Sequence, residues 1–197
     1  MNRVELPVSE ENIRGLKVGD EVSISGVMIT ARDAAHKYLI ENEADEVREV
    51  LKDGMLYHCG PIVAKENGDW KFIAAGPTTS KREEPYEADV IGRYGVRGVI
   101  GKGGMGERTL AACKKHGAVY LHAIGGLAVI LARSVRRVRE VHKLDEFGTP
   151  EAMWVIEVED FPVVVTMDSH GNSLHAEVLE RSSKNAAELA ESLQEGR

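Results

Sequence analysis

The stretch VRGVIGKGGMGERTLAACKKHGAVYLHA, residues 96–123, decides the fold that we expect for this chain. Its first apolar run predicts a β-strand, and a glycine-rich loop follows at 101–106. A helix is then predicted up to Gly117, and a second apolar run predicts another strand. This strand–helix–strand order is typical of α/β folds, in which helices cover a sheet.

The same change from strand to helix is predicted twice before this stretch. EVSISGVMIT (21–30) alternates apolar and polar residues as a half-buried strand does, and residues 31–47 have a helical pattern. Residues 55–64 and 70–75 are predicted as strands around the turn ENGD, and residues 80–95 as a helix.

The C-terminal third of the chain has a less regular pattern. Residues 125–135 predict a short buried helix, and 153–168 predict two strand-like runs interrupted by Pro162. Residues 172–197 predict a charged helix, of which the part 180–197 is expected to fray. We expect one domain over residues 1–197, because this length suits a single core.

Composition favours some classes of function over others. A formal net charge of −7 disfavours nucleic-acid binding, because phosphate would be repelled except at a local cluster of cations. No apolar run approaches the ~20 residues of a membrane span, and the N-terminus does not resemble a signal peptide. We therefore expect a cytoplasmic protein with neither a nucleic acid nor a membrane as partner.

The cysteines and histidines do not have the spacing of a metal site. Cys59 and Cys113 form no CxxC motif, so two buried free thiols are expected rather than a disulfide or an iron–sulfur site. His170 and His175 lie five positions apart, which is not the spacing of a helical ligand pair. We predict no metal ligands on this chain.

Each of the three predicted junctions between strand and helix carries a cation. The first amides of a helix lack internal partners and attract anions, and glycine lets an anion approach the backbone. Arginine can bind a carboxylate through two parallel hydrogen bonds, so two arginines and a lysine at these junctions suit a small dicarboxylate ligand. The cations are Arg32 near Thr30, Arg82 near Thr78 and Thr79, and Lys102 in the loop 101–106.

Each junction also has an interpretation that needs no ligand. Thr30 with Asp33, and Ser80 with Glu83, have the spacing of a capping box, in which the side chains satisfy the first helical amides. Arg32 or Arg82 taken alone could form a surface salt bridge, and Lys102 could lie on a solvated turn. The functional interpretation depends on all three junctions together.

Four motifs in sequence order resemble a known family. GVMITARDAAHK, GPTTSKRE, VIGKGGM and VVVTMDSHGNSLH are similar to the β subunit, or C-terminal domain, of class I fumarate hydratases and of the related L-tartrate dehydratases. The resemblance covers about Leu6 to Leu179. It implies an α/β fold of the swivelling β/β/α type, with a mixed sheet flanked by helices.

The resemblance also implies an activity and a partner. The family adds water reversibly to fumarate to give L-malate, a step of the tricarboxylic acid cycle, at a [4Fe-4S] cluster held by an α subunit. This chain would therefore be a β subunit, half of a heteromeric hydro-lyase, inactive without its partner. An isolated chain could form a homodimer through an exposed apolar patch.

The family's residue roles transfer to matching positions of this chain. Thr78 would be the catalytic base, and Arg32, Arg82 and Lys102 would bind the substrate carboxylates. Asp33, His36 and Thr79 are supporting candidates. Asp33 and His36 are three positions apart, so a helix would place them on one face, where the carboxylate could orient the imidazole.

Three other functions compete with this one. L-tartrate dehydratase uses a substrate that differs only by a hydroxyl, and the residues that recognise it need not lie on this chain. The loop at 101–106 also mimics the GxxG loop of a KH nucleic-acid-binding module. A non-enzymatic interaction protein that retains the old site is the third alternative.

Overall fold

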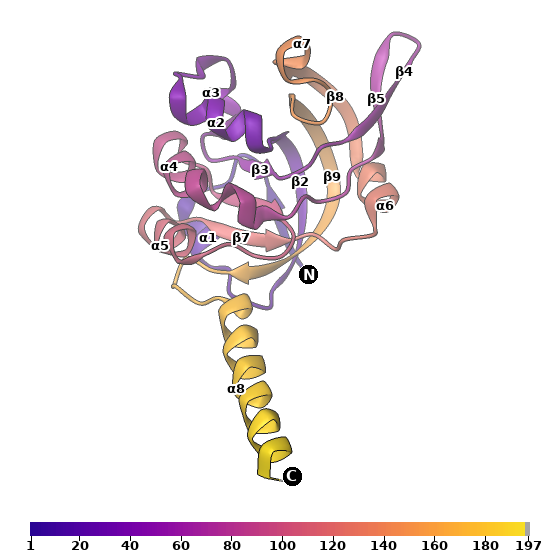
Figure 1. The fold of residues 1–197 in the computed structure, drawn as a ribbon. Helices are drawn as coiled ribbons and strands as arrows, with labels where there is room; N and C mark the ends of the chain where they lie inside the picture. Colours follow the sequence, from indigo (N-terminus) through magenta and orange to yellow (C-terminus); the bar gives the residue numbers. More distant parts are fainter. Residues whose placement is uncertain (196–197) are drawn as a thin grey trace.

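The computed structural model describes residues 1–195, and a closed ring of strands forms its centre (Figure 1). A seven-stranded sheet has the order β1-β2-β3-β6-β7-β9-β8, and an additional pairing of β2 with β9 closes it through β3, β6 and β7. Strands β1, β2, β3, β6 and β7 are mutually parallel, whereas β9 is antiparallel to its neighbours. The strands are β1 (Asn2–Glu5), β2 (Glu21–Thr30), β3 (Met55–Tyr57), β6 (Gly98–Gly101), β7 (Val119–His122), β8 (Val135–His142) and β9 (Met153–Met167).

Alternation along the parallel strands builds two separate hydrophobic cores. Tyr57 and Leu121 belong to one buried cluster, while their neighbours Leu56 and Tyr120 belong to the other. Successive side chains of a strand point to opposite faces, so short strands of continuous apolar residues serve both cores.

The second core lies between the parallel strands and four helices on one side of the sheet (Figure 1). These helices are α2 (Asp33–Glu41), α3 (Asp45–Leu51), α4 (Glu84–Tyr94) and α5 (Glu107–His116). Gly117 ends α5 in the left-handed conformation at φ 66°, which glycine adopts without steric cost. The remaining elements are α1 (Glu10–Arg14), the hairpin β4 (Ile62–Glu66) and β5 (Asp69–Ala74), the 3₁₀ helix η1 (Ser80–Glu83), α6 (Ala128–Arg133), α7 (Leu144–Phe147) and α8 (Leu174–Glu195).

The mixed α/β class with a sheet flanked by helices is confirmed, and two predicted elements are each divided in the structure. The helix predicted over 31–47 is α2 and α3, because Asn42 adopts an extended conformation and its side-chain amide donates to the Tyr38 carbonyl. The strand predicted over 55–64 is β3 and β4, and the chain leaves the main sheet around Gly60 and Pro61, the latter lacking an N–H donor.

Two strands differ from the prediction for identifiable reasons. β8 was not predicted, because its valines recur every third residue, at 135, 138 and 141; two irregularities in its pairing with β9 accommodate this spacing. The two runs predicted around Pro162 form one strand, β9. Pro162 lies beyond the stretch paired with β8, which ends at Val158, and before the stretch paired with β7, which begins at Val164.

The two C-terminal helical predictions are confirmed in position. Helix α6 is only half buried, since Val129 and Ile130 are exposed while Leu131 is covered, so the prediction of a buried helix was wrong for its outer face. Helix α8 projects away from the rest of the molecule (Figure 1). The fraying expected over 180–197 stays a prediction, and residues 196–197 of this range lie outside the described part of the chain. Within residues 1–195, no helix is both long and apolar enough to cross a membrane.

Candidate functional site

The three predicted junctions meet at the carboxyl ends of the parallel strands. Arg32 follows β2 and Lys102 follows β6, and adjacent parallel strands end at the same edge of a sheet. The segment around Thr78 reaches this edge after the β4–β5 hairpin. It pairs with the glycine-rich loop: the Lys102 amide donates to the Thr78 carbonyl at 3.2 Å, and the Ser80 amide donates to the Lys102 carbonyl at 3.0 Å.

Side-chain ion pairs connect the first junction to the second. Arg82 Nη2 lies 2.6 Å from Asp33 Oδ2, and Arg32 Nη2 lies 4.0 Å from the same oxygen. The Nε of Arg32 also lies 3.3 Å from Glu151 Oε1. A Cβ at Gly60 would lie 2.5 Å from Arg32 Nη1, so only glycine leaves room for the guanidinium in this position.

Neither predicted capping box forms. The Thr30 hydroxyl accepts a hydrogen bond from the Trp154 amide at 3.1 Å, on the neighbouring strand β9. The Ser80 hydroxyl is buried and contacts His58 and Tyr120 instead of capping a helix. These two hydroxyls are held by tertiary contacts that a local sequence pattern does not encode.

Carboxylates of the protein itself occupy two of the three helix N-termini. Glu151 accepts from the Ala34 amide at the start of α2. Glu84 accepts from the amides of Gly106, Arg108 and Thr109 at the start of α5. These two helix ends therefore already bind carboxylates of the protein itself. A ligand at this edge would be recognised mainly by side-chain cations.

The predicted supporting residues are arranged differently from the expectation. Asp33 pairs with Arg82 and does not orient His36, whose ring contacts Glu87 and the Arg32 carbonyl. Thr78 is half buried, whereas Thr79 is exposed, with its methyl group facing the backbone at Gly103. The choice of Thr78 over Thr79 as the residue facing a substrate stays a prediction.

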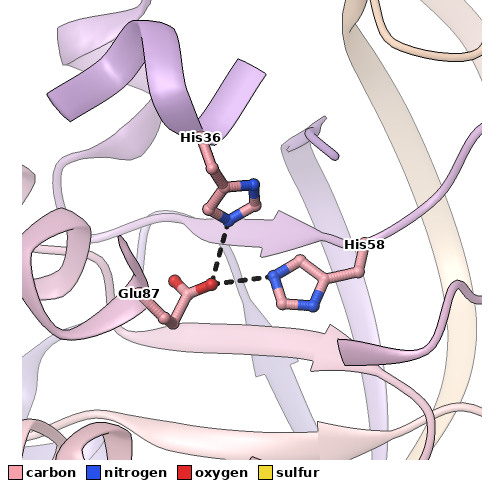
Figure 2. Close-up of side chains that lie close together, drawn as sticks. All are labelled: His36, His58 and Glu87. Atoms are coloured by element: carbon pink, nitrogen blue, oxygen red, sulfur yellow. Dashed lines mark hydrogen bonds and ion pairs between the residues drawn. The ribbon is translucent and has the colours of Figure 1, made fainter. Parts of the chain in front are cut away.

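A buried cluster of His36, His58 and Glu87 lies behind these loops (Figure 2). Glu87 Oε2 lies 2.9 Å from His36 Nε2 and 2.8 Å from His58 Nε2, and all three side chains are fully buried. These residue types can ligate metals, but the separations are those of direct hydrogen bonds. We therefore describe the cluster as hydrogen-bonded.

Burial and charge act in opposite directions on the groups of this cluster. Burial favours a higher pKa for Glu87, but the charge of His36 and the hydrogen bonds from both histidines lower this pKa to about 2. Burial favours a lower pKa for His36, but Glu87 and the more distant Glu83 raise it. Burial alone dominates at His58, whose pKa is lowered, and at Glu83, whose pKa rises to about 7.

Sequence reasoning missed His58, Glu83 and Glu87. The two glutamates stand four positions apart and point inward with the apolar residues Val90 and Ile91 of α4. Carboxylates on the apolar face of a helix are the signal that could have identified them.

The two cysteines do not fit an iron–sulfur cluster. Cys59 and Cys113 are buried free thiols that belong to different core clusters, as predicted from their spacing. Burial raises the pKa of the Cys59 thiol to about 12 and that of Cys113 still further, whereas a metal ligand must be a thiolate.

The fold and these loops define an α/β protein with three cation-bearing loops at the carboxyl edge of its parallel strands. Residues 1–178 match the family model described as Fumarase C-terminus, and the chain belongs to that family. The resemblance inferred from the four motifs is thereby confirmed.

Relatives with curated names agree with this family. The chain is 52% identical over 189 residues to a putative fumarate hydratase class I from Geobacillus stearothermophilus, covering 95% of this chain but 36% of that protein. It is 42% identical to a putative L(+)-tartrate dehydratase subunit beta from Methanocaldococcus jannaschii, covering 92% of this chain and 95% of the relative. It is 40% identical to the L(+)-tartrate dehydratase subunit beta of Escherichia coli K12, covering 87% and 85%.

Proposed function

We propose that this chain is the β subunit of a class I fumarate hydratase, which adds water to fumarate to form L-malate. The observation that carries the proposal is the convergence of Arg32, Thr78, Arg82 and Lys102 on loops joined by hydrogen bonds and ion pairs at one edge of the sheet. Membership of the Fumarase C-terminus family supports a hydro-lyase role for that edge.

A partner chain would complete the enzyme. The chain spans about a third of the first relative and nearly the full length of relatives named as beta subunits, which is the division expected if an α subunit carries the rest. The [4Fe-4S] cluster is proposed to reside on that partner, since the two buried cysteines here do not fit it. When bound there, the cluster would supply a Lewis-acidic iron.

The cations of this chain would bind the two carboxylates of the substrate. Asp33 holds one side of the Arg82 guanidinium, but arginine has five N–H donors, and its side chain is 48% exposed. The remaining donors can therefore reach a carboxylate without breaking the ion pair. Arg32 is similarly placed against Glu151, while Lys102 offers a compact charge on the glycine-rich loop.

The hydroxyl of Thr78 is proposed to remove the C3 proton of malate. A positioned base contributes on the order of 10²–10⁴-fold to a rate. A threonine hydroxyl is a weak base unless cations lie nearby, and Lys102, whose backbone amide donates to the Thr78 carbonyl, is the cation proposed to serve there.

Reconstitution tests this function. The purified chain is mixed anaerobically with its α partner, iron and sulfide, and hydration of fumarate is compared with dehydration of L-tartrate. We expect fumarate and malate to be turned over, and either chain alone to be inactive. Turnover of tartrate alone would contradict the assignment.

L-tartrate dehydratase is the second candidate function. It is favoured by the relatives named as beta subunits, which match this chain over most of both lengths. The same pair of assays decides between the two substrates.

The family assignment gives no support to the KH-like alternative. The cytoplasmic location and the homodimer of isolated chains stay predictions.

A further inference from the structure

A continuous chain of buried polar side chains connects the loops of the candidate site. The Tyr120 hydroxyl on β7 donates to Ser80 Oγ at 2.8 Å, and Ser80 Oγ lies 2.8 Å from His58 Nδ1. His58 Nε2 and His36 Nε2 both contact Glu87 Oε2 (Figure 2). This series of hydrogen bonds thus runs from the sheet to α4 and on to α2.

The hydrogen-bond partners of His58, together with its lowered pKa, are consistent with one arrangement of its protons. Because Ser80 accepts from Tyr120, its own proton is free to be donated to His58 Nδ1. His58 is then neutral, with its remaining proton on Nε2 donated to Glu87. This agrees with the lowered pKa of His58.

The same reasoning gives His36 two protons. Its Nδ1 lies 2.9 Å from the Arg32 carbonyl, which can only accept, so Nδ1 carries a hydrogen. Its Nε2 lies 2.9 Å from the Glu87 carboxylate, which also accepts. A second carboxyl group, Glu83 on η1, lies 3.7 Å from His36 Nδ1. The His36 ring also lies edge to face with the neutral His58, with 5.0 Å between the ring centroids.

We propose that His36 and Glu87 form a buried ion pair that positions the substrate-binding loops, His36 as a cation and Glu87 as its counter-ion. Through His36 the pair holds the carbonyl of Arg32. Through His58 it holds the second loop, because the His58 carbonyl accepts from the Thr78 amide at 2.6 Å. For its effect on catalysis the inference depends on the proposed function, but the charge state and the loop geometry do not.

Packing around the pair supports a positioning role. A Cβ at Gly101 would overlap Ser80 Oγ and would lie 3.2 Å from His58 Nδ1. The end of β6 therefore packs directly against these hydrogen-bonded side chains. A buried ion pair is often no more stabilising than apolar residues of similar size, whereas breaking one is costly. Its value here is to fix two loops in one arrangement.

The first test needs no activity. Long-range ¹H–¹⁵N spectra of the full chain at pH 7.5, assigned with a His36→Asn variant, report which ring nitrogens carry protons. We expect both nitrogens of His36 to be protonated and only Nε2 of His58. A neutral His36 in the wild-type chain would overturn the proposal without any further variant.

Glu87→Gln then tests positioning, with Asp89→Asn, an exposed acid on the same helix, as the matched control. We expect Glu87→Gln to make His36 neutral and to shift the backbone amide signals of Thr78 and Lys102, and Asp89→Asn to do neither. Unchanged amide signals in a folded Glu87→Gln chain would overturn the positioning role.

The second measurement uses the chain reconstituted with its α partner. Glu87→Gln should lower kcat/KM for malate at least tenfold and move the pH profile, whereas Asp89→Asn should stay within twofold of wild type. Wild-type kinetics in Glu87→Gln would contradict the inference. If the wild-type complex is inactive, the proposed function fails, and the spectra alone still decide whether the ion pair positions the loops.

Discussion

At the scale of single residues, the two adjacent threonines of the second junction have different surroundings. The backbone of Thr78 is held on both sides, its amide by His58 and its carbonyl by Lys102. Thr79 is exposed, with its methyl group near Gly103. A residue fixed at both backbone groups is better suited to hold a reacting hydroxyl in place.

Replacement of each threonine by alanine distinguishes their roles. In the reconstituted enzyme, Thr78→Ala should lower kcat by on the order of 10²-fold or more with a smaller change in KM, because a base acts in the transition state. Thr79→Ala, the matched control, should stay within a few-fold of wild type. Steady-state kinetics with malate measure both, and the opposite order would transfer the role to Thr79.

At the scale of elements, η1 and α4 place two buried carboxyl groups near His36, and these two groups differ in their hydrogen bonding and in their pKa. Glu87 is ionised and paired, whereas both carboxyl oxygens of Glu83 are buried without a hydrogen-bond partner. Burial raises the pKa of Glu83 to about 7. The unfolded chain would ionise this group near pH 4.5, so the folded state binds its proton more tightly.

The stability of the chain should therefore fall with rising pH between about 4.5 and 7 because of Glu83. Glu83→Gln removes this dependence while keeping the shape. One pKa unit corresponds to about 1.4 kcal/mol. The free energy of unfolding of the variant should therefore exceed that of wild type by roughly 1–3 kcal/mol at pH 8 and by little at pH 5. Urea unfolding at the two pH values measures the difference; the same gain at both would show that Glu83 is not protonated in the folded state.

At the scale of the whole molecule, the closed ring of strands and its helices are separate from the projecting helix α8. The match to the family model ends at residue 178, and the side chains of residues 177–191 are all exposed. Among the residues of α8 whose burial is described, 174–191, none belongs to either hydrophobic core. The ring with its two cores should therefore fold without most of this helix.

Truncation after Arg181 tests this separation. Because no core residue is lost, the shortened chain should unfold with a midpoint within about 2 °C of the full chain. Thermal unfolding followed by circular dichroism measures the midpoint. A fall of 10 °C or more would show that the helix supports the ring through contacts beyond its first turns.

Local sequence patterns were sufficient for the fold class and for where most strands and helices lie. The strand over 21–30, the glycine-rich loop at 101–106 and the helix end at Gly117 each depend on neighbours in the chain, which is why they could be predicted. Four motifs in order were enough to identify the family.

Tertiary structure alone decided how the ring closes and what lies behind the loops. β9 pairs with β2 and β7, which are distant from it in sequence, and the cluster joins His36, His58 and Glu87 from three separate segments. Hydrogen bonds between such segments leave no periodic pattern in the sequence, and neither do the tertiary partners of Thr30 and Ser80 that replaced the predicted caps. The protonation of His36 has the same origin, because burial and the facing carboxylates exist only when the chain is folded.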